Sequence, residues 1–94
     1  IVLTARGVVR RMQGRMGEAM EAYRAGQALD PMDPLPVLNL GVLLDLYLGR
    51  ATEALAEYER YQALLPAPDV QVAAWITEVR IRAGRQEQSA EAAP

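Results

Sequence analysis

Residues 14–23 read GRMGEAMEAY, and residues 49–58 read GRATEALAEY. Gly, Arg, Glu, Ala and Tyr thus recur at matching places with a spacing of 35, and the same offset relates Pro31 to Pro66. A third Gly-Arg pair follows after another 35 residues, at positions 84–85. A fixed period of this length is typical of repeat proteins, in which each unit is one supersecondary motif that buries its apolar face against the next.

The units differ in length at one place. Gly7 and Gly41 correspond at a spacing of 34, so the second unit has one extra residue between Gly41 and Gly49. When residues are counted back from the last Gly-Arg pair, Ile76 takes the place of Gly41. Because isoleucine would collide with a close partner helix, we expect the third helix to end the array as a lone cap.

Each unit has the pattern of two helices. Apolar residues recur at helical spacing, and no segment alternates with a period of two, so no strands are expected. Asp33 before Pro34 predicts an N-cap with proline at the first helical position, and Asp69 after Pro68 predicts another helix start. Residues 84–94 contain no large apolar side chain and are expected to form a frayed or disordered tail. The expected helices cover residues 1–13, 17–29, 34–48, 51–65 and 69–83.

This pattern resembles the tetratricopeptide repeat, a helix-turn-helix unit of about 34 residues. The resemblance implies an all-α fold in which five helices stack as a right-handed α-solenoid. It divides the chain into repeat one (about 1–33), repeat two (about 34–68) and a terminal helix (about 69–83). It rests on Gly7, Gly14, Glu18-Ala19, Tyr23 and Asp30-Pro31 in the first unit and on Leu40-Gly41, Gly49, Glu53-Ala54, Tyr58 and Pro66 in the second.

The physical roles of these residues follow without the family name. Small residues such as Gly41 and Ala54 let paired helices approach closely, while Tyr23 and Tyr58 fill the space between neighbouring pairs. Tyr47, Tyr61 and Trp75 are likewise expected in the core rather than on a stacking platform. The first helix is more polar, with Arg6 and Arg10 where the second unit has leucines, which is typical of an edge helix. Whether it is a true N-terminal cap or a truncation stays open.

The composition excludes most catalytic chemistry. The 94 residues include no Cys and no His, and all ten basic residues are Arg. A thiol nucleophile, a histidine base and a Schiff-base lysine are therefore absent. The glutamates of the second helices are expected to be solvated on the outer surface. We therefore predict a protein that is not an enzyme, with no catalytic residue, no cofactor and no metal site.

Charge and hydropathy restrict the partners. The net charge of −2 provides no basic surface for nucleic acid. The longest apolar stretch, residues 37–48, is shorter than the roughly 20 residues that a membrane span requires. The chain begins without a methionine, so we expect a fragment of a longer protein whose compartment its sequence does not encode. The Ala- and Arg-rich usage suggests a bacterial source.

Polar residues of the first helices are candidate partner contacts. Asp45 interrupts an apolar run and is expected either to contact a partner or to pair with an arginine such as Arg11 or Arg80. The cluster of Arg6, Arg10, Arg11 and Arg15 is either a solvated face or a docking site for an acidic segment. Asn39 either presents its amide to a bound peptide or packs between helices. The Lys- and Asn-rich clamp of some chaperone adaptors is absent, because the matching positions are Thr4, Val8, Val70 and Ala74.

The resemblance implies a binding function. In stacked helix pairs the first helices line a concave surface, which suits an extended or helical segment of another protein. We therefore expect a protein–protein interaction scaffold. The alternative is a self-associating module, or a docking module of a larger bacterial envelope protein of the pilus- or secretion-assembly type. The expected groove residues are Thr4, Val8, Arg11, Leu35, Leu38, Asn39, Val42, Asp45, Leu46, Thr77, Arg80 and Ile81.

Overall fold

The computed structural model describes residues 14–92, with side chains described as far as Gln88. The described residues do not include the expected helix at 1–13. Three residues of the expected groove therefore lie outside them, namely Thr4, Val8 and Arg11. The described part of the chain is all-helical, as predicted, and the five-helix solenoid stays a prediction. Its elements are α2 (Met16–Leu29), α3 (Pro34–Val42), the π-helix η1 (Leu43–Tyr47), α4 (Ala51–Ala63) and α5 (Val70–Ala92).

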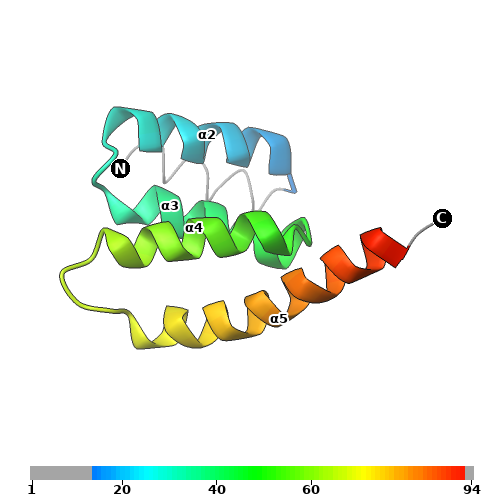
Figure 1. Ribbon diagram of the computed structural model, residues 1–94. Coiled ribbons are helices and arrows are strands. Elements are labelled where there is room, and N and C mark those ends of the chain that lie inside the picture. Colours follow the sequence, from blue (N-terminus) through cyan, green and yellow to red (C-terminus); the bar gives the residue numbers. More distant parts are fainter. Residues whose placement is uncertain (1–13, 93–94) are drawn as a thin grey trace.

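Consecutive helices run antiparallel and lie side by side (Figure 1). Helix α3 packs against α2 and α4, and α4 packs against α5. The turns at Gly14 and Gly49 both have positive φ angles, +78° and +63°, a conformation that glycine adopts without strain. The residue pairs Arg15–Glu18 and Arg50–Glu53 form ion pairs directly after these turns. The 35-residue repeat of the sequence therefore appears as a repeated local structure.

Both predicted N-caps are confirmed. The Asp33 Oδ1 accepts a hydrogen bond from the Leu35 N–H at 3.0 Å, and Pro34 occupies the first position of α3. The Asp69 Oδ1 accepts hydrogen bonds from the backbone N–H groups of Gln71 and Val72 at the start of α5. These caps satisfy N–H groups that have no partner within the helix, and so they define where α3 and α5 begin.

The end of the predicted helix 34–48 is a π-helix rather than an α-helix. In η1 the Leu48 N–H donates to the Leu43 carbonyl, five residues back, at 3.1 Å. A π-turn holds one residue more than an α-turn. It lies between Gly41 and Gly49, where the second unit has its extra residue. The insertion is thus accommodated inside the helix, and the turn at Gly49 is preserved.

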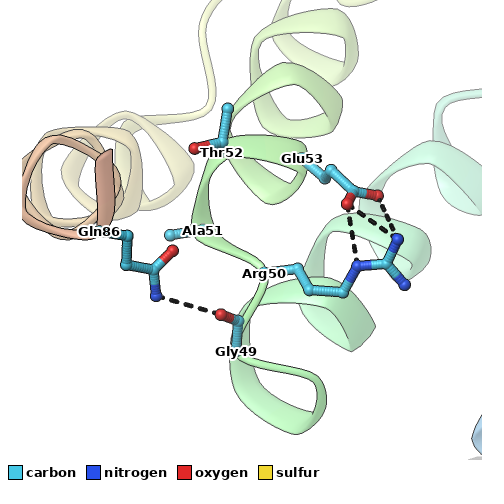
Figure 2. A pocket seen from close by; sticks show the side chains of 6 residues that line it. All are labelled: Gly49, Arg50, Ala51, Thr52, Glu53 and Gln86. Carbon is cyan, nitrogen blue, oxygen red and sulfur yellow. Dashed lines mark hydrogen bonds and ion pairs between the residues drawn. The ribbon is translucent and has the colours of Figure 1, made fainter. Parts of the chain in front are cut away.

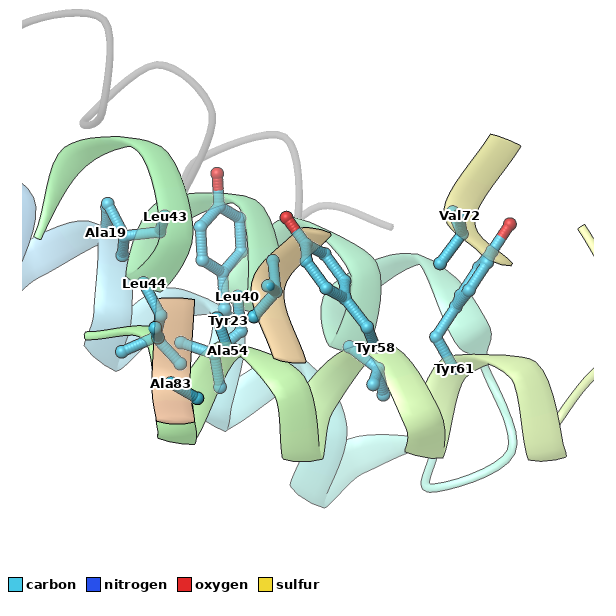
Figure 3. Close-up of a cluster of buried hydrophobic side chains, with 13 residues drawn as sticks. Ala19, Tyr23, Leu40, Leu43, Leu44, Ala54, Tyr58, Tyr61, Val72 and Ala83 are labelled. Carbon is cyan, nitrogen blue, oxygen red and sulfur yellow. The ribbon is translucent and has the colours of Figure 1, made fainter. Parts of the chain in front are cut away.

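The core is one cluster of aliphatic and tyrosine side chains from all the described helices (Figure 3). Tyr23 and Tyr58 are fully buried, as predicted. The Tyr58 ring lies against the backbone of Gly41, where a Cβ would come within 2.7 Å of two ring carbons. The close approach expected at Gly41 is therefore made by a tyrosine ring. Tyr47 differs from the prediction, because it is about half exposed.

Helix α5 does not end at residue 83, so the expected disordered tail is wrong for residues 84–92. Gly84 lies inside the helix and makes no turn, unlike Gly14 and Gly49. Extending an existing helix needs no new nucleus, and residues 85–92 lack proline and consist of Arg, Gln, Glu, Ser and Ala. The Gln86 Nε2 also donates to the Gly49 carbonyl at 3.1 Å, which ties the extension to the turn before α4 (Figure 2).

The register assigned to the third helix needs a correction. Ile76 is partly buried against the core, whereas Thr77 is exposed. Ile76 was matched to Gly41 by using the offset of eight positions between Gly41 and Gly49. That offset includes the extra residue that forms the π-turn of η1, and α5 has no such π-turn. In the first unit the glycine lies seven positions before the Gly-Arg pair (Gly7 and Gly14), and the same offset from Gly84 gives Thr77. The expected collision at Ile76 is therefore wrong, because this side chain points inward.

None of the described helices combines the length and apolar character that a bilayer span requires.

A candidate partner-binding face

A buried polar network joins η1, α4 and α5. The Tyr58 hydroxyl of α4 donates a hydrogen bond to the Asp45 Oδ2 at 2.9 Å. The other carboxylate oxygen of Asp45 forms an ion pair with the Arg82 guanidinium of α5 at 2.6 Å. The Asp45 side chain is only 6% exposed, whereas Arg82 remains 42% exposed. A charge this deeply buried is stable only when it is paired, so the network fixes the position of α5 relative to η1.

Asp45 thus pairs with an arginine, which was one of the two expected alternatives, but the arginine in the described residues is Arg82 rather than Arg80. Arg80 pairs instead with Glu59 of α4 at 3.2 Å, and Arg11 lies outside the described residues. Arg80 and Arg82 are two residues apart and so lie about 200° apart around the helix. Only Arg82 is on the side of α5 that meets η1. The π-turn directs the Asp45 carboxylate toward Tyr58 and Arg82, so most of this side chain is buried.

The buried hydroxyl of Tyr58 predicts a loss of stability at alkaline pH. Burial and the hydrogen bond to Asp45 raise the pKa of Tyr58 well above its ordinary value of about 10. The unfolded chain therefore releases this proton first. The stabilisation from Tyr58 is complete below about pH 10 and declines above it by about 1.4 kcal/mol per pH unit.

Urea unfolding at pH 8 to 11 measures this decline. Tyr58→Phe removes this contribution to the slope of stability against pH. It leaves the contribution of Tyr61, because burial and a hydrogen bond to Asp69 also raise the pKa of Tyr61. The difference in unfolding free energy between the original chain and the variant is expected to shrink above pH 10. A constant difference across the range would contradict the buried hydroxyl.

Beside the network lies a cavity of about 180 Å³ between η1 and α5. Asp45 and Leu46 line it from η1, and Trp75, Glu78 and Arg82 line it from α5. The Trp75 ring packs on Tyr58 with 5.9 Å between the ring centroids, so it belongs to the core and to the cavity wall. The cavity therefore combines a fixed aromatic wall with charged groups at its edge.

An apolar row continues from this cavity along α3. Leu35, Leu38, Val42 and Leu46 follow one another at helical spacing on one side of α3 and η1. Leu38 and Val42 are partly buried, Leu35 is about half exposed, and Leu46 is 70% exposed. This row and the cavity residues of α5, which are Trp75, Glu78 and Arg82, form one surface. We call this surface the binding face.

The structure brings together only part of the expected groove. Leu35, Leu38, Val42 and Leu46 lie on the binding face, and Asn39 is partly buried beside them on α3. The α5 candidates lie elsewhere, because Arg80 bonds to α4 and the exposed side chains of Thr77 and Ile81 do not line the cavity.

The sequence interpretation missed Trp75, Glu78 and Arg82 as site residues. Their spacing of i, i+3 and i+7 places them on one side of a helix, which was the available signal. Asp45 supplied a second signal, because a buried carboxylate in an apolar run requires a cation on a neighbouring helix. The register taken from the lengthened second unit directed attention to Thr77, Arg80 and Ile81 instead.

Comparison with known proteins provides no family assignment. No family model matches the chain, and no curated protein matches it. Within residues 14–92, no three Asp or Glu side chains gather as a metal site would require.

Proposed function

We propose that this chain is a protein–protein interaction module that holds a segment of a partner protein on the binding face. The observation that carries the proposal is the row of apolar side chains on α3 and η1, which is partly open to solvent and ends at a cavity. Leu46 is the most exposed member of that row. Large apolar side chains grouped on one surface are typical of interaction sites.

The shape of the face favours a segment rather than a globular surface. The row on α3 and η1 provides apolar contacts at regular intervals, and the cavity provides one deeper anchor point. Peptide recognition commonly combines such apolar contacts with a few polar anchors. The repeated helix pairs, which resemble tetratricopeptide repeats in sequence, support the same function.

Leu46→Asp is expected to weaken partner binding by roughly tenfold or more, because burying a leucine side chain contributes about 1.5–3 kcal/mol. The partner is first captured from the native cell and identified. Its dissociation constant is then measured with the purified original chain and with the variant, while circular dichroism checks that helix content is unchanged.

Leu29→Asp is the matched control. Leu29 is 77% exposed, similar to Leu46, but it lies at the end of α2, near the turn into α3 and at the other end of α3 from η1 (Figure 1). This variant is expected to bind the partner like the original chain. Equal binding by all three proteins, or equal loss in both variants, would exclude the binding face as the interaction site.

A further inference from the structure

We propose that the cavity between η1 and α5 receives a basic side chain, arginine or lysine, of the partner segment. This inference rests on the proposed function and adds the chemistry of the anchor residue. The charged residues that line the cavity are two acids, Asp45 and Glu78, and one base, Arg82, so their charges do not cancel.

Three charged groups line the cavity, and two of them are already paired. Asp45 and Arg82 form the ion pair described above, and Tyr58 donates a further hydrogen bond to Asp45. Glu78 forms no hydrogen bond or ion pair with any of the side chains described for residues 14–88. The cavity therefore carries one unpaired negative charge, which a cation entering beside Trp75 would neutralise.

The apolar walls suit the stem of such a side chain. Leu46 and Trp75 provide hydrocarbon and aromatic surface on opposite elements of the cavity. Lysine and arginine bury their methylene stems against apolar surface while their charged ends remain at the edge. A cation within about 6 Å of an indole ring also gains a cation–π interaction. Trp75 is well suited to this role because its packing on Tyr58 fixes the ring.

The charge of the surrounding surface favours the same partner. All twelve acidic residues of the chain lie within residues 14–92, whereas three of its ten arginines, Arg6, Arg10 and Arg11, precede them. Residues 14–92 therefore carry a net negative charge, which favours basic segments. An acidic anchor would meet Glu78 at the cavity, and a purely apolar anchor would leave the Glu78 carboxylate partly desolvated without a partner.

The test is a nuclear magnetic resonance titration of the full 94-residue chain with N-acetyl-arginine amide. We expect saturable shifts at the Trp75 indole N–H and at the amides of Leu46 and Glu78. N-acetyl-citrulline amide, which has a similar shape but no charge, is expected to bind at least threefold more weakly. Absence of a shift at Trp75, or equal binding of the two compounds, would overturn the proposal.

Glu78→Gln and Glu87→Gln form a matched pair of variants. Both glutamates are exposed residues of α5, but only Glu78 lines the cavity. Glu78→Gln is expected to weaken N-acetyl-arginine amide binding by roughly 1.5-fold to fivefold, which is the range for an exposed ion pair. Glu87→Gln is expected to leave it unchanged. Equal affinities of the two variants would overturn the role of Glu78.

Failure here is distinguishable from failure of the proposed function. If Leu46→Asp abolishes partner binding while N-acetyl-arginine amide leaves Trp75 unaffected, the binding face stands and the basic anchor is wrong. If Leu46→Asp leaves partner binding intact, the binding face itself is wrong.

Discussion

Replacing Tyr58 by alanine is expected to lower the free energy of unfolding by about 3–5 kcal/mol, the range for removing a large buried aromatic ring. The Tyr58 ring is 1% exposed and contacts both the Gly41 backbone and the Trp75 ring. Its hydroxyl also holds the Asp45 carboxylate. Since small domains are stable by only about 5–15 kcal/mol, the variant is expected to be marginally folded. Urea unfolding followed by circular dichroism measures the change.

Tyr58→Phe separates the ring from the hydroxyl. The phenylalanine ring keeps the packing and removes only the hydrogen bond to Asp45, whose other oxygen still pairs with Arg82. We expect a loss of about 1–3 kcal/mol, which is the usual effect of removing one partner of a buried polar group. Equal losses in the two variants would show that the ring contributes no packing energy, contrary to its position at the meeting point of three helices.

Gly41→Ala is expected to destabilise the chain by up to about 2 kcal/mol. The added Cβ would come within 2.7 Å of two carbons of the Tyr58 ring, which is buried and cannot move aside easily. Overpacking of this kind costs about 1–3 kcal/mol, and the better helix propensity of alanine returns about 1 kcal/mol of it. Thermal and urea unfolding provide the measurement.

Gly84→Ala is the control for this variant and also tests the length of α5. Gly84 is helical, and a Cβ there would meet no atom within 4 Å. The same substitution is therefore expected to stabilise the chain by about 0.5–1 kcal/mol and to raise its helix content. Destabilisation at Gly84, or stabilisation at Gly41, would contradict the packing described for these two glycines.

Local signals predicted much of the helical structure. Asp33-Pro34 and Asp69 defined two helix starts because capping depends on neighbouring residues alone. The 35-residue repeat located the glycine turns at Gly14 and Gly49 for the same reason. Tyr58 could be placed in the core because the repeat aligned it with Tyr23.

The features of the structure that the sequence did not predict depend on contacts between segments that are distant in the chain. A periodicity cannot show whether an extra residue lengthens a turn or forms a π-helix, so η1 was not predictable from the repeat. The pairing of Asp45 with Arg82 depends on how α5 is rotated against η1. The continuation of α5 past Gly84 depends partly on the contact of Gln86 with the Gly49 carbonyl.

The central claim is that a partner segment lies on the binding face, and mapping the bound partner on the chain tests it most directly. Amide and side-chain resonances of the labelled chain are recorded with and without the captured partner. The account predicts the largest shifts at Leu38, Val42, Leu46 and Trp75. Shifts concentrated instead at two exposed apolar residues, Leu29 at the end of α2 and Met32 in the turn before α3, would contradict it.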